Sequence, residues 1–194
     1  VDKSALSQYQ TDNYLLSDHL ESKHTGSRFK GTCFKKKYPC DAVDLSNNAP
    51  SLGNQFTQEL RFKIDNTVKV CSGVSCIGGQ LIGSVNWRAP KISIIASGAR
   101  IGYGFYGRAG SIYVDTPDSV NFDKWHHLAT TFDGTNYRLY LDGEEINNST
   151  LLQGKTPLEC DESQPCDKVD MISDTRFVGK IDEVRVWNVV RTGE

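Results

Sequence analysis

The chain contains 194 residues, with 22 Lys and Arg side chains against 24 Asp and Glu, and its formal net charge is −2 at pH 7. This near balance gives no global reason to expect nucleic acid as a partner, and no apolar run approaches the ~20 residues that span a bilayer. The length suits a single β-sandwich whose core requires neither a metal nor a disulfide. Because the chain starts at Val1 and ends in a polar stretch, we expect it to belong to a longer multidomain protein.

Residues 1–27 lack the alternation of a β-strand and form an N-terminal extension or linker that precedes a domain over residues 28–194. One interpretation is a short helix with Ser4 as its N-cap. The apolar stripe of that helix would consist of Ala5, Tyr9, Leu15, Leu16 and Leu20. The other interpretation is a partly ordered leader, and the sequence favours neither.

The six cysteines fall into three pairs that are close in sequence, Cys33 and Cys40, Cys71 and Cys76, and Cys160 and Cys166. An even number in local pairs predicts three small disulfide-closed loops and an oxidising compartment, although bridges between loops stay open as an alternative. A zinc site would require Cys-x2-4-Cys spacing with partner histidines. The Cys71-x4-Cys76 spacing comes near that pattern, but no histidine neighbours it.

The first cysteine pair encloses three consecutive lysines, Lys35, Lys36 and Lys37, flanked by aromatic residues. This is the densest basic cluster of the chain. It indicates an anionic ligand, such as a sulfated glycan or an acidic lipid headgroup. The alternative is a solvated loop whose charges only maintain solubility.

Short strands begin after the basic loop. Leu60, Phe62 and Ile64 alternate with polar residues, which predicts a strand with one buried face. Four more candidates are separated by Gly and Pro and lie at 81–86, 91–96, 100–106 and 111–114. A strand and turn every 8–12 residues is typical of a β-sandwich.

Within this region the stretch IGYGFYGRAG, residues 101–110, combines four glycines with Tyr103 and Tyr106. It is no phosphate loop, because no Gly-Lys-Ser/Thr and no helix follow. Aromatic side chains on a Gly-rich strand could form a platform on which a sugar stacks. The alternative is a strand that bends where backbones approach closely.

Residues 121–146 predict an antiparallel meander. Leu128, Thr130 and Phe132 share one face of a strand, and Leu139 and Leu141 share one face of the next. Turn residues at 133–136 separate the two strands, and the Asp-Gly pair at 142–143 predicts a second hairpin. We expect this buried face to be covered by a second sheet.

Asn147 and Asn148 begin two overlapping Asn-x-Ser/Thr sequons just past the second hairpin turn. In a eukaryotic secretory protein they mark an exposed glycosylation site, whereas in a bacterial protein they carry no meaning. The acidic segment 159–174 follows, with six carboxylates against one lysine. Such density can bind Ca²⁺ through oxygens, but the spacing matches no EF-hand pattern, and we expect a solvated acidic loop.

The last predicted strand, residues 181–187, places Asp182 on the same parity as Val184 and Val186. If these valines face the core, the Asp182 carboxylate begins an inward row and requires backbone N–H donors or a cation to compensate its charge.

Two long stretches resemble a known family. WHHLATTFDGTNYRLYLDGEEI (125–146) and FVGKIDEVRVWNVVRT (177–192) are similar to the laminin-G-like branch of the concanavalin A-like jelly rolls, and residues 41–64 resemble its opening strands. The resemblance covers roughly residues 28–192 and implies an all-β fold, a two-sheet antiparallel jelly roll. In many such jelly rolls the acidic residue at this place in the final strand helps bind a structural Ca²⁺, and that role falls on Asp182.

We therefore expect a non-enzymatic, secreted or cell-surface recognition module. The hydrolase branch of the superfamily carries Glu-x-Asp-x-(x)-Glu along one strand, and no strand candidate here has that series. His126 and His127 are neighbours on one strand and point in opposite directions, so they cannot chelate one metal. Two hypotheses remain, a carbohydrate-binding module and a protein-interaction or spacer module of a larger adhesive protein. The core is predicted to contain Leu60, Phe62, Leu128, Phe132, Leu139, Leu141, Val184 and Val186.

Overall fold

The computed structural model describes residues 14–16, 27–30, 43–45, 49–64, 79–84, 88–95, 100–106, 109–117, 123–159, 166–173 and 177–192. Within these ranges the strands are β1 (Tyr14–Leu16), β2 (Ser27–Lys30), β3 (Val43–Asp44), β4 (Phe56–Ile64), β5 (Gln80–Gly83), β6 (Lys91–Ile95), β7 (Arg100–Gly104), β8 (Ser111–Asp115), β9 (His126–Phe132), β10 (Tyr137–Leu141), β11 (Glu144–Ser149), β12 (Met171–Ile172) and β13 (Val178–Trp187). A 3-10 helix, Pro157–Glu159, follows β11. No described helix is long and apolar enough to cross a membrane.

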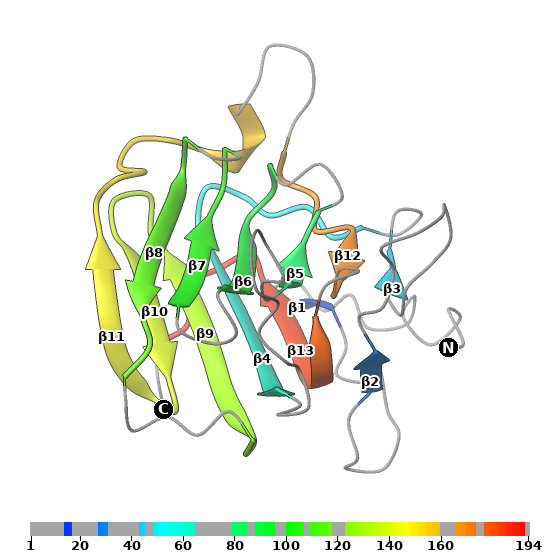
Figure 1. The fold of residues 1–194 in the computed structure, drawn as a ribbon. Coiled ribbons are helices and arrows are strands. Elements are labelled where there is room, and N and C mark those ends of the chain that lie inside the picture. Colours follow the sequence, from blue (N-terminus) through cyan, green and yellow to red (C-terminus); the bar gives the residue numbers. More distant parts are fainter. Residues whose placement is uncertain are drawn as a thin grey trace.

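The strands form two antiparallel sheets that pack face to face (Figure 1). Sheet A has the order β1-β13-β4-β9-β10-β11, with β2 also paired to β13, and sheet B has the order β3-β12-β5-β6-β7-β8. The predicted two-sheet antiparallel jelly roll is therefore confirmed. Its predicted strand positions agree with β5 to β8 except at the ends, where β5 stops at Gly83.

The core lies between the two sheets and is built from inward-facing residues of the strands whose side chains the structure describes. All eight residues predicted to be inside are at most 4% exposed. Four aromatic rings meet at its centre: Phe56 lies 5.5 Å from Tyr137, and Phe105 lies 5.3 Å from Phe132, centroid to centroid. Such edge-to-face pairs each contribute about 1 kcal/mol beyond the area they bury.

Both predicted hairpins of the meander are present. In the second hairpin Leu141 pairs with Glu144, and the two residues between them, Asp142 and Gly143, have φ of 53° and 87°. Two consecutive positive φ values define the type I′ turn, whose twist matches that of the flanking strands. This local chemistry explains why the hairpins could be predicted from sequence.

A β-bulge in β13 contradicts the predicted inward position of Asp182. Asp182 pairs with Arg61 and Arg185 pairs with Glu59, so β13 has one more residue than β4 between these pairs. Glu183 absorbs the extra residue with φ of 49°. The bulge reverses the side-chain parity, and Ile181, at 3% exposed, faces the core in place of Asp182.

The N-terminal region contributes to sheet A. The predicted helix does not extend through Tyr14–Leu16, because these residues form β1 and pair with β13. Cys166 is disulfide-bonded, but the other five cysteines lie outside the described residues, so the three local pairings remain a prediction. Lys35, Lys36 and Lys37 also lie outside the described residues.

Candidate functional site

The Gly-rich strand is β7, which lies between β6 and β8 in sheet B. Tyr103 points from this strand into the core and is 0% exposed. Its hydroxyl donates to Asn147 Oδ1 at 2.6 Å, and burial raises the pKa of the phenol. Tyr103 is therefore a core residue, which contradicts its predicted contact with a ligand.

Tyr106, the second predicted aromatic, ends this segment with φ of 67° and is partly buried against the core. Its ring lies 5.4 Å from that of Phe105, and its hydroxyl donates to the backbone oxygen of Glu159 at 3.0 Å. These contacts hold the 3-10 helix Pro157–Glu159, where the acidic segment begins, against the sandwich. Tyr106 therefore has a structural role, because both its ring and its hydroxyl are engaged in contacts within the domain.

The outer side of sheet B, away from the core, presents a different aromatic residue. Among the aromatic side chains whose exposure the structure describes, only Tyr113 is exposed, at 54%. Tyr113 on β8 pairs with Gly102 on β7, and Gly102 pairs with Ser93 on β6. A Cβ atom at Gly102 would lie 3.1 Å from Tyr113 Cε1 and 3.0 Å from Ser93 Oγ. The missing side chain at Gly102 thus allows the tyrosine ring to lean over β7.

Polar groups flank this ring along the sheet. On one side Arg100 Nε lies 2.6 Å from Asp115 Oδ1, and both side chains are more than half exposed. On the other side Lys91 Nζ donates to Ser111 Oγ at 3.0 Å, across the position of Gly104. We call Arg100, Gly102, Ser111, Tyr113 and Asp115 the Tyr113 surface. It combines one exposed aromatic face with hydrogen-bond donors and acceptors on both sides.

The sequence contained the signal for this surface. Ile112 and Val114 form the apolar row of β8, and period-two alternation then places Tyr113 on the outer side. The same rule assigns Tyr103 to the inward row with Ile101. Proximity to glycines favours Tyr103 and Tyr106, but strand parity decides which ring is exposed.

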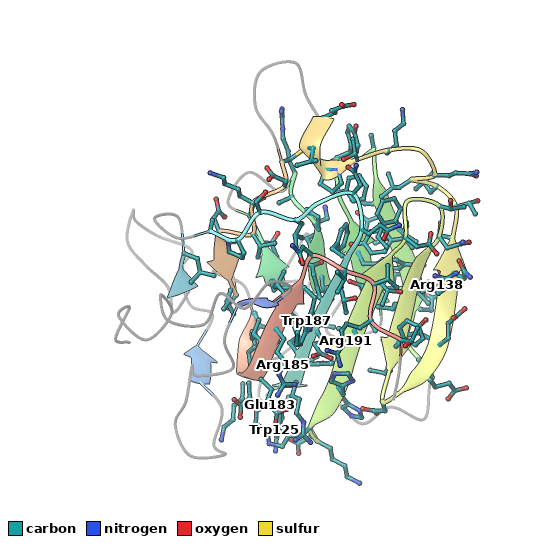
Figure 2. All side chains as sticks on the ribbon, turned by 180° about the vertical axis from the view of Figure 1, so that it is seen from behind. Trp125, Arg138, Glu183, Arg185, Trp187 and Arg191 are labelled. Atoms are coloured by element: carbon teal, nitrogen blue, oxygen red, sulfur yellow. The ribbon has the colours of Figure 1, made fainter. Side chains whose placement is uncertain are left out.

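The outer side of sheet A carries a network of charges centred on Glu59. The Glu59 carboxylate lies 3.3 Å from His127 Nε2 and 3.6 Å from Arg185 Nη1, and Trp187 Nε1 donates to it at 3.4 Å. The hydrogen bond from His127 is the main cause that holds the pKa of Glu59 below its usual value. Figure 2 shows Arg185 and Trp187 projecting on this side of β13.

The bulge residue Glu183 extends this network. Its carboxylate lies 3.3 Å from Arg61 Nη1 and 3.5 Å from Arg185 Nη2. Arg191 returns over the same face, with its guanidinium 4.4 Å from the Trp187 ring (Figure 2). The five residues Glu59, Arg61, His127, Glu183 and Arg185 are called the Glu59 network, whose charges compensate one another.

Asp182 lies at the edge of this network, opposite Arg61 on β4. One of its carboxylate oxygens accepts the backbone N–H of Glu183 at 2.9 Å. In the part of the chain that the structure describes, no three His, Cys, Asp or Glu side chains are grouped so that they could hold a metal. Calcium binding through Asp182 therefore remains a prediction from the sequence.

The structure also bears on two further sequence predictions, one on the histidine pair and one on the acidic segment. His126 and His127 do point to opposite sides of β9: His126 is 9% exposed on the inner side and His127 joins the Glu59 network. Asp167, from the acidic segment predicted to be solvated, is only 4% exposed and accepts a hydrogen bond from the Ser51 hydroxyl. The solvated loop is therefore wrong for Asp167.

Comparison with known families identifies the class of protein that has this architecture. The family model described as the concanavalin A-like lectin/glucanases superfamily, in its laminin G-like form, matches residues 40–194. The match covers well over half of the chain, so the chain belongs to this family. Sequence comparison with curated proteins gives no match.

Solved structures show the same fold at low sequence identity. The heptameric SAP-like pentraxin from Limulus polyphemus is 16% identical with a TM-score of 0.59, over 85% of this chain and 76% of that one. Domains LG4-5 of the mouse laminin alpha1 chain are 14% identical with a TM-score of 0.52, over 87% and 47% of the two chains. A proposed carbohydrate-binding protein from Bacteroides ovatus is 21% identical with a TM-score of 0.52, over 78% and 44%. The chain thus spans less than half of the latter two.

Proposed function

We propose that this chain is a non-catalytic carbohydrate-binding module that acts outside the cell and binds its glycan at the Tyr113 surface. The observation that carries the proposal is the exposed Tyr113 ring between two pairs of polar side chains. An aromatic ring offers a flat apolar face, which fits the C–H face of a sugar ring. Arg100, Asp115 and Ser111 supply donors and acceptors for its hydroxyls.

The Tyr113 surface is more exposed than the neighbouring strand β6 of the same sheet. Lys91 and Ser93 on β6 are only 5% exposed, whereas Arg100, Tyr113 and Asp115 near the β8 edge are exposed. A ligand would therefore approach β7 and β8 rather than β6. Binding sites generally combine one apolar contact area with a small number of placed polar groups, and this arrangement meets that description.

The family supports the proposal in a general way. Its description includes lectins and glucanases, and one structural neighbour is a proposed carbohydrate-binding protein. The hydrolases of this superfamily carry a series of acidic residues along one strand, and no strand candidate of this chain has that series. We therefore do not propose a glucanase activity. Binding without hydrolysis is the simpler function for these residues.

The alternative is a protein-interaction or spacer module of a larger adhesive protein. The observation that favours it is the Glu59 network, which presents fixed charges on the outer side of sheet A. Charges arranged in this way select partners by electrostatic complementarity more than they add affinity. In both cases we propose an extracellular location, which agrees with a disulfide-bonded Cys166.

A glycan array tests the proposal, with the wild type and three variants in Ca²⁺ and again in chelator. We expect Tyr113→Ala to lose binding and Tyr113→Phe to retain it, because the ring provides the stacking face. Tyr140→Ala is the matched control, since Tyr140 lies on the outer side of sheet A between Ala129 and Glu145. The proposal is wrong if the wild type binds no glycan or if Tyr113→Ala binds as well as the wild type.

The same array separates the basic loop from the Tyr113 surface. Changing Lys35, Lys36 and Lys37 to Ala should reduce binding to sulfated glycans only if that loop contacts the ligand. Loss of binding in chelator would support the predicted calcium, and Asp182→Ala should then remove the difference between Ca²⁺ and chelator. Equal binding in both conditions would remove calcium from the proposal.

A further inference from the structure

Strand β11 contains two overlapping sequons that are equivalent in sequence but not in structure. Its end reads Asn147-Asn148-Ser149-Thr150, so Ser149 completes the sequon of Asn147 and Thr150 completes that of Asn148. β11 is the last strand of sheet A and pairs with β10. A register shift between Leu139 and Tyr140 sets which asparagine faces the core.

Asn147 faces inward. It pairs with Leu139, which belongs to the core, and it is partly buried. Its side-chain Oδ1 accepts a hydrogen bond of 2.6 Å from the hydroxyl of Tyr103, a fully buried residue. This hydrogen bond fixes the orientation of the Asn147 amide on the partly buried inner side of β11, so a sugar on Nδ2 would start from a crowded position.

Asn148 faces outward. It is exposed and pairs with Arg138, on the side of β10 opposite to Leu139. Arg138 itself is paired with Asp133, with Nη1 2.7 Å from Oδ2, and Asn148 is exposed beside it. Thr150 is exposed as well. A glycan at this position would project into solvent from the edge of sheet A.

We propose that Asn148, and not Asn147, carries an N-linked glycan when the chain passes through a eukaryotic secretory pathway. The donor is a lipid pyrophosphate-linked oligosaccharide. The bond between the sugar C1 and the pyrophosphate oxygen breaks and a bond from C1 to Asn148 Nδ2 forms. The amide loses one proton and the lipid pyrophosphate leaves.

Folding enforces the choice between the two residues. Both sequons are accessible in an extended chain, but on folding a bulky sugar at Asn147 would have to fit beside the partly buried inner side of β11. Crowding at this position destabilises such a molecule. The folded, secreted population therefore carries the glycan at Asn148, where it also shields an edge strand from pairing with another chain.

The test uses the full chain secreted from cultured animal cells. Enzymatic removal of N-glycans in ¹⁸O-water converts an occupied asparagine to labelled Asp, and peptide mapping then reads which position was modified. Ser149→Ala removes only the sequon of Asn147, and Thr150→Ala removes only that of Asn148, so the two variants are a matched pair. We expect the label at Asn148 in the wild type and in Ser149→Ala, and no label in secreted Thr150→Ala.

The peptide map of the wild type decides the matter even if a variant is poorly secreted. A secreted wild type without label at Asn148 overturns the proposal, and so does label at Asn147. Secreted Thr150→Ala that carries label at Asn147 overturns it as well, because folding would then tolerate the sugar at the inward position.

Discussion

The turn between β9 and β10 depends on one carboxylate, and its replacement gives a quantitative test of the structure. Asp133 Oδ1 accepts the backbone N–H groups of Thr135 and Asn136 at 2.9 and 2.7 Å, and Oδ2 lies 2.7 Å from Arg138 Nη1. Burial by itself would raise the pKa of Asp133. The hydrogen bonds from Asn136, Arg138 and Thr135 outweigh it and lower the pKa to about 2.

The stability that this carboxylate contributes follows from the difference in pKa. The folded value of about 2 lies below the unfolded value of 3.8, so the ionised form is favoured by folding. At about 1.4 kcal/mol per pH unit, the difference corresponds to about 2 kcal/mol. Because the folded pKa is depressed, the contribution is complete above pH 3.8 and is lost as the pH falls through about 2.

Urea unfolding of the wild type and Asp133→Asn measures this contribution. At pH 7 we expect the variant to lose about 2 kcal/mol of unfolding free energy, which corresponds to roughly 4 to 8 °C in Tm for a chain of this size. The difference should shrink as the pH falls from 4 to 2, because the folded Asp133 carboxylate becomes protonated as the pH approaches its pKa of about 2, whereas Asn stays neutral throughout.

Asp115→Asn is the matched control. Asp115 also faces an arginine at 2.6 Å, but both side chains are more than half exposed, and exposed ion pairs contribute little. A difference between wild type and Asp133→Asn that stays constant from pH 7 to pH 2 would refute the reasoning, since it would come from packing rather than charge.

Substitutions at three further positions probe the sandwich itself. Phe132→Ala removes a fully buried ring and should lower the unfolding free energy by about 3–5 kcal/mol in urea titrations, and a loss below 1 kcal/mol would contradict the packed core. Gly104→Ala should destabilise by at least about 3 kcal/mol or prevent folding, as read by circular dichroism, because the new Cβ would lie 1.9 Å from the oxygen of Gly110 at a φ of 132°. Glu183→Gly should leave the unfolding free energy unchanged or raise it by up to about 1 kcal/mol, since glycine accepts the positive φ. Glu183→Val should lower the unfolding free energy, and thermal unfolding measures both variants. A destabilised Glu183→Gly would show that its exposed ion pairs matter more than the strain.

The sequence by itself determined the fold class, the main strands and most of the core. Leu139 and Leu141 alternate with polar residues, and a strand with that pattern has one buried face. The Asp-Gly pair at 142–143 encodes its own turn, because only small or Asx residues accept two positive φ values readily. These features depend on neighbours within a few residues, so one sequence is enough to predict them.

Alternation also determined which tyrosine is exposed, although proximity to glycines suggested another. Ile101 and Tyr103 share one parity on β7, and Ile112 leaves Tyr113 on the outer side of β8. The contact between Tyr113 and Gly102, by contrast, joins two strands whose register is fixed by the whole sheet. That contact could not be predicted from either strand alone.

Only the tertiary structure decided the positions of Asp182 and of the two sequon asparagines. Each lies beside an irregularity, the bulge at Glu183 in β13 and the register shift before Asn147 in β11. A single extra residue exchanges the inner and outer faces of everything beyond it. Where that residue is inserted depends on how two strands fit against a common core, and neither Glu183 nor Ile146 is a residue type that marks such a place in the sequence.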